Sequence, residues 1–532
     1  MISKIYIQNF RSIKEITLDP SNLSALIGPN SSGKTNILKA IDLVLGEGWT
    51  TKAKVARELF NDSQKNIEIE ISFKDPITVP NDRGFSDTKV LNIKLVMSLN
   101  PELTAKTTIN NGQVFYGQEK FKKLCHFIYI PSERNLSSEL RVSQWTMLGK
   151  IMRIVYENYI SYYQNDEEKL KEDFKTKMFP AKEFLEANFS ETAITFKKFV
   201  DKFKEKCSQN SSGLANDFNP VLDIYNLNWF YKTLQIHVKE DLLSRYFDSE
   251  EVGAGMKNLL MISIFQTYAE LMGGKVIFGI EEPEIYLYPQ AQRSLYKSFI
   301  KLSENTQIFY ATHNPNFIDS SRADDIFLLR KSIGQGTYKL KKEEYFSTKN
   351  ASLDKNKYKI YTHFNPERNE LFFAKKVLFV EGDSDKILFS TLCEEKWGID
   401  LDKNGISIIS CNGKGGVNYF LGVCNLIGFE EHFAVWDKDP KDESYKPDRD
   451  FLSESREKGR GMEINPNLEG FLKLSLNSKE KVKNAHDWAL NVEVKNIPKE
   501  FKVIEFFLKN KIIEERAEVE TENESMANHH PF

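Results

Sequence analysis

The chain has 532 residues, of which 40% are hydrophobic and 28% charged, and its formal net charge is −3. This composition is typical of a soluble globular protein, and the length predicts about three or four domains. The charge gives no overall basic signal for nucleic acid, although a local basic groove or bound metal ions would still suit a DNA-binding enzyme. Five scattered cysteines without a C-x-x-C pair argue against a disulfide framework and a zinc site.

The N-terminal segment MISKIYIQNF has the alternation of an amphipathic strand and not the features of a signal peptide. Further strands are predicted around Ile16 and Leu18 and over residues 67–73 and 127–130, with a hairpin turn at Asn110-Asn111-Gly112. No apolar run approaches the length of a membrane span. We therefore expect a cytoplasmic protein without a membrane partner.

Residues 28–35, GPNSSGKT, fit the phosphate-loop pattern G-x-x-x-x-G-K-[ST]. An apolar strand (residues 23–27) precedes this loop and a helical pattern follows it, a context that argues against a chance match. Glycines would let the backbone N–H groups turn toward a polyphosphate, Lys34 would reach the β- and γ-phosphates, and Thr35 would bind Mg²⁺. We expect the whole loop to hold a nucleoside triphosphate: Gly28, Pro29, Asn30, Ser31, Ser32, Gly33, Lys34, Thr35 and Asn36.

The stretch from about 140 to 245 is dense in Lys and Glu and poor in Gly, with a helical apolar period. One helical face carries Phe196, Phe199, Val200, Phe203 and Cys207. We predict a helical or coiled-coil insertion between two halves of an ATPase. Two interpretations stay open: a lever or dimerisation arm, and a solvated helical subdomain with one buried face.

Two further segments carry features of nucleotide hydrolysis. A Gly-rich turn from Ser249 to Gly255 opens an apolar helix, and the strand VIFGIEEPE (276–284) ends in carboxylates. Glu281 would hold the metal through water, and Glu282 would orient or deprotonate the attacking water. A third strand (307–311) ends just before His313, which we place near the γ-phosphate; the alternative is a structural histidine.

Another α/β pattern begins near residue 371. Apolar strands at 376–380, 406–410 and 433–436 are followed by Glu381, a Gly-rich turn (412–416) and Asp437-Lys438-Asp439. Strand ends meet at the ligand-binding edge of a parallel sheet, and acids gathered there repel one another unless cations bind. Carboxylates favour Mg²⁺ or Mn²⁺, and two such ions about 4 Å apart activate water for phosphodiester cleavage. The alternative is a set of acidic surface turns.

Four segments of the first 370 residues, NFR (9–11), GPNSSGKTN, EEPE and ATHNP, resemble the ABC-type ATPase heads of the RecF, SMC and OLD (overcoming lysogenization defect) group. The resemblance implies that two heads sandwich ATP, so that the chain is at least a homodimer. It also implies contacts in trans from Ser249 or Gly253. Two departures stand out: the Gly-rich turn lacks the full consensus, and the LHP motif of the group is Leu287-Tyr288-Pro289 here.

The later pattern resembles the TOPRIM domain of topoisomerases, primases and OLD-family nucleases. Glu381, Asp437 and Asp439 match its catalytic acids. The resemblance implies that Asp385 serves a second metal and that Asp442 and Glu469 are further metal ligands. It also calls for a catalytic lysine, for which Lys481 and Lys483 are the candidates.

The fold class we expect is α/β: an ABC-type P-loop ATPase head with a helical insertion (1–370), followed by a Rossmann-like TOPRIM nuclease domain with an acidic C-terminal tail (371–532). The resemblance implies an ATP-regulated, Mg²⁺- or Mn²⁺-dependent DNA endonuclease, similar to the nuclease subunit of Gabija-type antiphage systems. Its partners would be double-stranded DNA, a second copy (homodimer or homotetramer) and a UvrD-like helicase encoded nearby. The alternative is a RecF/SMC-like DNA-repair ATPase with a non-cleaving TOPRIM module.

Overall fold

The computed structural model describes residues 1–510 except 49, 81–86, 116–117, 144–145, 165, 167, 171–189, 191, 212–216, 223–233, 240–245, 273–275, 320–321, 323–324, 341–365, 439–450 and 475–479. It forms two compact units, which we describe separately. The first comprises residues 1–7, 17–24 and 37–312, and the second 8–16, 25–36 and 313–532. The phosphate loop therefore groups with the C-terminal part, which differs from the single boundary expected at residue 370. The acidic tail lies outside the described residues.

The largest sheet has twelve strands in the order β7-β6-β5-β4-β1-β2-β15-β14-β3-β13-β12-β8. Strands β3, β12 and β13 are buried at every position, as expected for parallel strands covered on both faces. Strands β4 and β5 pair antiparallel and bury alternate residues over much of their length, so one of their faces is more exposed. The strands are β1 (Ile2–Phe10), β2 (Ile13–Leu18), β3 (Leu23–Ile27), β4 (Ile67–Val79), β5 (Thr88–Ser98), β6 (Thr104–Ile109), β7 (Gln113–Val114), β8 (His126–Ile130), β12 (Val276–Glu281), β13 (Gln307–Ala311), β14 (Ile326–Ser332) and β15 (Gly336–Lys339).

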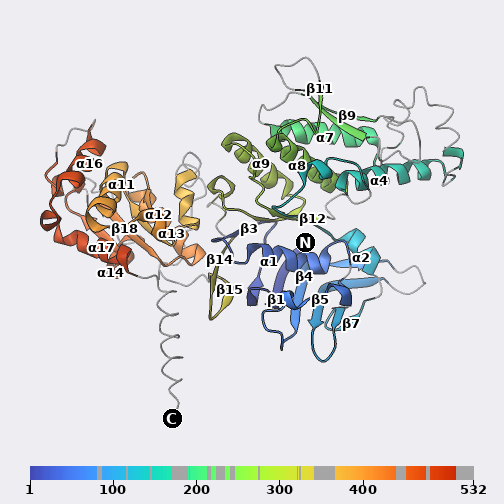
Figure 1. Ribbon diagram of the computed structural model, residues 1–532, viewed down its shortest axis with the longest axis horizontal. Helices are drawn as coiled ribbons and strands as arrows, with labels where there is room; N and C mark the ends of the chain where they lie inside the picture. Colours follow the sequence, from blue (N-terminus) through green and yellow to red (C-terminus); the bar gives the residue numbers. More distant parts are fainter. Residues whose placement is uncertain are drawn as a thin grey trace, which may run out of the picture. The chain divides into compact units, whose positions relative to one another are not determined.

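Helices fill the connections between these strands (Figure 1). Helix α1 (Lys34–Leu45) follows the phosphate loop, and α8 (Ala254–Leu271) and α9 (Pro289–Leu302) flank β12 in sequence. The shorter helices are η1 (Lys52–Lys54), η2 (Arg57–Leu59), α2 (Gln118–Leu124), α3 (Leu136–Glu139) and η4 (Pro315–Phe317). Within the part of the chain that the structure describes, no helix has the length and apolar character needed to cross a membrane.

The insertion is only partly helical, which corrects the prediction for residues 140–245. Helices α4 (Met147–Tyr162) and α7 (Phe196–Ser211) are present. The predicted apolar face of α7 is buried at Phe196, Phe199, Phe203 and Cys207, whereas Val200 is only partly buried. Three antiparallel strands, β9 (Asp217–Leu222), β10 (Leu234–Lys239) and β11 (Tyr246–Asp248), follow in the order β11-β10-β9. Strand β10 buries alternate residues, a period of two that the surrounding charged sequence concealed.

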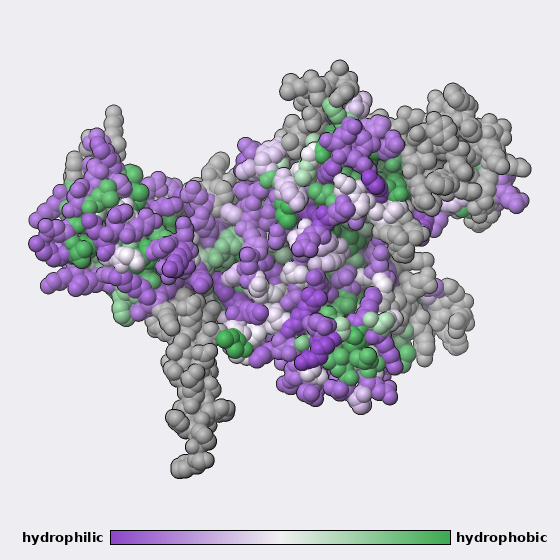
Figure 2. All heavy atoms as spheres, in the orientation of Figure 1, coloured by the Kyte–Doolittle hydropathy of each residue, from purple (hydrophilic) through white to green (hydrophobic). Residues whose placement is uncertain are grey.

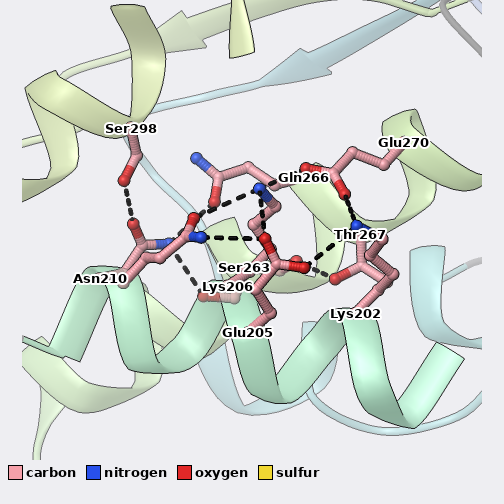
Figure 3. A network of polar contacts seen from close by, with 10 residues as sticks. Lys202, Glu205, Lys206, Asn210, Ser263, Gln266, Thr267, Glu270 and Ser298 are labelled. Carbon is pink, nitrogen blue, oxygen red and sulfur yellow. Dashed lines mark hydrogen bonds and ion pairs between the residues drawn. The ribbon is translucent and has the colours of Figure 1, made fainter. Parts of the chain in front are cut away.

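A buried polar network joins α7 to α8 and α9 (Figure 3). The amide nitrogen of Asn210 donates to Ser263 Oγ at 3.1 Å and to Gln266 Oε1 at 2.8 Å, and its oxygen accepts from Ser298 Oγ at 2.6 Å. Lys206, itself buried, forms an ion pair with Glu270 on α8. Because unpaired buried polar groups are costly, these bonds fix α7 against both helices. This favours a packed subdomain, at least for α7, over a free arm.

The C-terminal part contains a four-stranded parallel sheet in the order β17-β16-β18-β19. Its apolar strands pack against α11 and against the C-terminal helices, and hydrophilic residues cover most of its visible surface (Figure 2). The elements are η6 (Pro366–Phe372), β16 (Lys376–Val380), α11 (Asp383–Thr391), η7 (Leu392–Trp397), α12 (Leu401–Asn404), β17 (Ile406–Ser410), α13 (Lys414–Ile427), β18 (His432–Asp437), α14 (Phe451–Glu457), β19 (Gly461–Ile464), α15 (Leu468–Phe471), α16 (Lys481–Asn491), η9 (Val494–Asn496), η10 (Lys499–Phe501) and α17 (Lys502–Lys509).

His432 makes the stability of this part dependent on pH. It is 1% exposed, and burial lowers the pKa of its imidazole to about 4, below the ordinary value of 6.5. The unfolded chain therefore takes up the proton first, and stability falls as the pH drops from about 6.5 to 4. We expect this group alone to cost about 2 kcal/mol of unfolding free energy between pH 7.5 and 5. Urea denaturation followed by tryptophan fluorescence at both pH values measures it.

The matched variant is His432→Asn, whose amide can replace the bond from Nδ1 to the Phe429 carbonyl, 2.9 Å long. Burial raises the pKa of Asp385 and of Asp437, and such shifts act in the opposite sense. We therefore compare the change in unfolding free energy between pH 7.5 and pH 5 in wild type with the same change in the variant. Equal pH dependence in the two proteins would contradict the assignment to His432.

Candidate functional sites

The phosphate loop turns between β3 and α1 with its lysine inside. Lys34 Nζ donates to the carbonyls of Gly28 and Pro29, both at 2.9 Å, and the side chain is 7% exposed. Gly33 has φ +100°, and a Cβ there would lie 2.3 Å from Thr337 Oγ1. A larger residue would be strained and would also clash. The loop thus has the compact backbone that brings N–H groups and an ammonium to a polyphosphate.

A polar cluster behind the loop was not predicted. Asn36 Nδ2 on α1 donates to Ser12 Oγ at 2.8 Å, and Ser12 Oγ lies 2.7 Å from Thr337 Oγ1 on β15. Arg11 Nη1 lies 3.5 Å from Asn36 Oδ1. The NFR motif thereby touches the first turn of α1. The participation of Thr337, more than 300 residues away in sequence, had no local signal.

His313 lies two residues beyond the end of β13 and is half-buried. Burial, and secondarily the charge of Lys34, lower the pKa of its imidazole. The neutral form is therefore favoured at pH 7, so its ring can both donate and accept a hydrogen bond. The charge of Lys34 therefore acts on the ring, and a position of His313 near the γ-phosphate stays a prediction.

The acidic strand end lies in the first unit. The Glu281 side chain is 5% exposed, and its Oε2 accepts from the N–H and Oγ of Ser132 at 3.1 and 3.3 Å. Its Oε1 is buried and has no hydrogen-bond partner among the described residues. A buried carboxylate oxygen without a donor is costly, and a cation or its water would satisfy it. The next residue, Glu282, is half-buried with φ +42°, a left-handed backbone that turns the chain sharply.

Two side chains missed by the sequence analysis hold this turn. Arg134 donates to the carbonyls of Glu281 (3.0 Å) and Glu282 (3.3 Å) and to Asn258 Oδ1 (2.8 Å). Asn258 Nδ2, on α8, donates to the carbonyls of Pro283 and Ile285 at 3.2 and 2.9 Å. The turn that presents the two glutamates is thus fixed by the helix that follows the Gly-rich turn. In the sequence, Arg134 stands out only as a charged residue shortly after the strand predicted over residues 127–130.

The two residues expected to contact a partner's nucleotide differ in accessibility. Gly253 is exposed directly before the first residue of α8, where the first N–H groups of a helix have no partner within the helix. Ser249 is 5% exposed, and its N–H donates to the Ile236 carbonyl at 2.9 Å. Of the two, Gly253 is therefore the accessible one in this structure.

Four predicted acids come together at one edge of the smaller parallel sheet. In the strand order β17-β16-β18-β19 the switch point lies between β16 and β18, where ligands bind in such sheets. Glu381 follows β16 and Asp437 ends β18, and Glu381 Oε2 accepts from the Asp437 N–H at 2.9 Å. Asp385 Oδ2 accepts a hydrogen bond from the Gly382 N–H at 2.8 Å. Asp437 Oδ1 accepts one from the Leu468 N–H at 2.9 Å. The strand ends thus hold the carboxylates in place.

Burial and mutual repulsion act on two of these acids. Burial, with Glu381 and Glu469 nearby, raises the pKa of Asp385 to about 7. Burial, with Asp385 and Glu381 nearby, raises that of Asp437 to about 8. Clustered buried carboxylates are stabilised in the charged form by divalent cations, so the donor set fits Mg²⁺ or Mn²⁺. Among the described residues, no group of three or more His, Cys, Asp or Glu side chains lies close enough together to hold a metal ion. Asp439 and Asp442 lie outside the described residues.

One of the two candidate lysines, Lys481, lies at the edge of this cluster of acids. Lys481, the first residue of α16, has its Nζ 2.9 Å from Oε1 of the buried Glu469. That hydrogen bond raises the pKa of Lys481, with smaller contributions from Asp437 and Asp385. Its ammonium is therefore charged and lies within the field of the acids. Among the described residues, Lys483 forms no ion pair with these acids, so Lys481 is the better of the two candidates.

Comparison with known protein families matches both parts of the chain. The AAA ATPase domain family matches residues 1–111 and 101–318, which together cover more than half of the 532 residues. The TOPRIM domain family of overcoming-lysogenization-defect-like proteins matches residues 372–439. The expected fold class, an ATPase head followed by a TOPRIM domain, is confirmed.

Three curated relatives are similar along most of their length. The OLD nuclease of Thermus scotoductus is 28% identical over 448 residues, covering 80% of each chain. Endonuclease GajA of Bacillus cereus VD045 is 23% identical over 482 residues, covering 84% of this chain and 76% of its own. The Old nuclease of Escherichia phage P2 is 22% identical over 476 residues, covering 81% and 76%.

Proposed function

This chain belongs to the overcoming lysogenization defect (OLD) family, and from that premise we propose that it cuts double-stranded DNA under the control of ATP. It is an endonuclease with an ATPase domain, and both domains point to the use of a nucleotide and a divalent metal. The observation that carries the proposal is the convergence of Glu381, Asp385, Asp437 and Glu469 at the switch point of the TOPRIM sheet.

We expect Mg²⁺ or Mn²⁺ to be held by Glu381, Asp385, Asp437 and Glu469. Asp439 and Asp442, which follow Asp437 in sequence, would be further ligands. Such ions, when bound, supply an activated water and neutralise the charge of a departing phosphodiester oxygen. The hydrogen bonds from the Asp437, Gly382 and Leu468 amides orient the carboxylates beforehand. Lys481, fixed by Glu469, would bring a positive charge to the DNA phosphate.

The ATPase residues would act as the control site. Lys34 and the loop amides would bind the phosphates, while Thr35 and Glu281 would hold Mg²⁺; the orphan Glu281 Oε1 supports that role. Glu282 would activate water for hydrolysis, and His313 and a partner's Gly253 would contact the γ-phosphate. From the resemblance to Gabija-type nucleases we extend the proposal to antiphage defence in the cytoplasm, as a homodimer or homotetramer beside a UvrD-like helicase.

Cleavage should depend strictly on a divalent cation. We expect supercoiled plasmid to be nicked or linearised with Mg²⁺ or Mn²⁺ and to stay intact in EDTA, because only bound cations let clustered carboxylates bind a polyanion. A zinc-selective chelator in the presence of excess Mg²⁺ should have no effect, since a cluster of carboxylate oxygens favours Mg²⁺ or Mn²⁺ over zinc. Agarose-gel conversion rates measure both effects. Cleavage that persists in EDTA would contradict the proposal.

A further inference from the structure

The helical segment η6, just before the TOPRIM sheet, carries two buried polar side chains that the proposed chemistry does not use. Arg368 is 9% exposed and Asn369 is 3% exposed. A buried guanidinium and a buried amide are costly unless their donors are satisfied. Both side chains donate to backbone carbonyls of segments far away in sequence, one on the nucleotide side and one on the nuclease side.

Asn369 faces the nucleotide side. Its Nδ2 donates to the carbonyls of Pro315 and Ile318, both at 2.9 Å, so both amide protons are used. These carbonyls begin and follow the short helix η4, which starts two residues after His313. His313 in turn lies within the electrostatic field of Lys34 in the phosphate loop. A displacement of the backbone after His313 would therefore change the hydrogen bonds of Asn369 to Pro315 and Ile318.

Arg368 faces the nuclease side. Its Nε donates to the Ser410 carbonyl, the last residue of β17, at 2.8 Å. Immediately after it, the Cys411 N–H donates to Val380 at 2.9 Å and the Gly413 N–H donates to the Glu381 carbonyl at 2.8 Å. Arg368 thus holds the strand end whose turn supports the backbone of Glu381.

A second connection runs parallel to this one. Arg330 Nη2, on β14, donates to the Ala374 carbonyl at 3.2 Å, just after η6. The carbonyl of its neighbour Leu329 lies 2.3 Å from where a Cβ on Gly28 would be. The first glycine of the phosphate loop and the entry to the TOPRIM sheet are therefore packed against consecutive residues of one strand. A rigid strand linking two sites is the kind of element that transmits a displacement.

We infer that Arg368 and Asn369 are positioning residues that couple the nucleotide site at His313 to the carboxylate site at Glu381. The inference rests on the proposed function, because it assigns the route by which ATP would regulate cleavage. It predicts that removing either side chain uncouples DNA cleavage from nucleotide binding, while cleavage and ATP hydrolysis each remain intact. Coupling between two sites is a free energy held by the groups that connect them, and these two side chains provide the hydrogen bonds of that connection.

The test uses the full chain and measures plasmid cleavage in Mn²⁺ with no nucleotide, with ATP and with a non-hydrolysable ATP analogue. The coupling ratio is the cleavage rate with nucleotide divided by the rate without it. We expect Asn369→Ala and Arg368→Leu to bring this ratio at least about fivefold closer to one. Both variants should keep nucleotide-free cleavage and ATP hydrolysis within about twofold of wild type, since neither residue touches the reacting groups. Arg368→Lys, which retains a donor, should keep more of the ratio than Arg368→Leu.

Glu370→Gln is the matched control, because Glu370 is an exposed residue of the same segment; its ratio should equal that of wild type. Hydrogen–deuterium exchange gives a second measurement: ATP should alter exchange at residues 406–413 in wild type and not in the variants. Unchanged ratios in folded Asn369→Ala and Arg368→Leu would overturn the inference alone. Wild-type cleavage that does not respond to nucleotide would overturn the inference together with the proposed ATP control, while the endonuclease activity itself would stand. Failure of wild type to cleave at all would overturn the proposed function and the inference with it.

Discussion

Removing the charge of Glu381 or of Asp437 should abolish DNA cleavage while leaving the ATPase intact. Glu381→Gln and Asp437→Asn keep an acceptor for the amides of Asp437 and Leu468, so the strand ends should stay in place. Each variant loses one anionic ligand of the cluster, and we expect the plasmid cleavage rate to fall by about 10³-fold or more. The alanine variants should fall as far. Gel-based cleavage rates and phosphate release from ATP, measured on the same preparations, separate the two activities.

These variants should also fold well. Burial is the largest cause of the raised pKa of Asp385 and of Asp437, and the neighbouring carboxylates add to it. The ionised carboxylates therefore repel one another in the absence of cations. Neutralising one member relieves that repulsion, so the melting temperature should stay level or rise. Glu395→Gln, an exposed acid of the same domain, is the control and should cleave like wild type. Cleavage that survives at both Glu381 and Asp437 would exclude them as metal ligands.

Features set by a few adjacent residues were predictable from sequence. The phosphate loop, the acidic strand end and the strands leading to Glu381 and Asp437 each consist of an apolar run followed by a polar turn. Because parallel strands end at one edge of a sheet, this local pattern also predicts that the acids converge. Choosing Lys481 over Lys483 needed the structure, since the two lie two residues apart and only the ion pair with Glu469 distinguishes them.

Features set by pairing between distant segments were not predictable. Arg134 and Asn258 reach the acidic turn from positions far before it in sequence, and an isolated Arg or Asn carries no periodic signal. The sheet formed by β9, β10 and β11 was missed for a related reason. Its strands are short and lie among dense charges, so the helical pattern of the neighbouring α7 dominated the interpretation. Tertiary contacts outweighed local composition there.

Replacing Glu282 by Gln should stop ATP hydrolysis while preserving ATP binding. The backbone at Glu282 is held by its own N–H, which donates to the Ala311 carbonyl at 2.8 Å, and by Arg134 on its carbonyl. Gln has nearly the same shape, so the turn and the neighbouring Glu281 should keep their positions. The variant loses the carboxylate that would accept a proton from water, and we expect the hydrolysis rate to fall by about 10²- to 10³-fold. Phosphate release and equilibrium binding of labelled ATP measure the two quantities.

The same variant tests whether nucleotide controls cleavage. With hydrolysis blocked, the ATP-bound state accumulates, so plasmid cleavage at a given ATP concentration should move further from its nucleotide-free rate than it does in wild type. Glu304 is an exposed acid two residues after the end of α9, and Glu304→Gln should behave as wild type in both assays. Hydrolysis within about twofold of wild type in Glu282→Gln would exclude Glu282 as the base. If ATP at any concentration left cleavage unchanged in wild type and variant alike, the phosphate loop and the TOPRIM carboxylates would act independently, and ATP would have to serve a step other than cleavage.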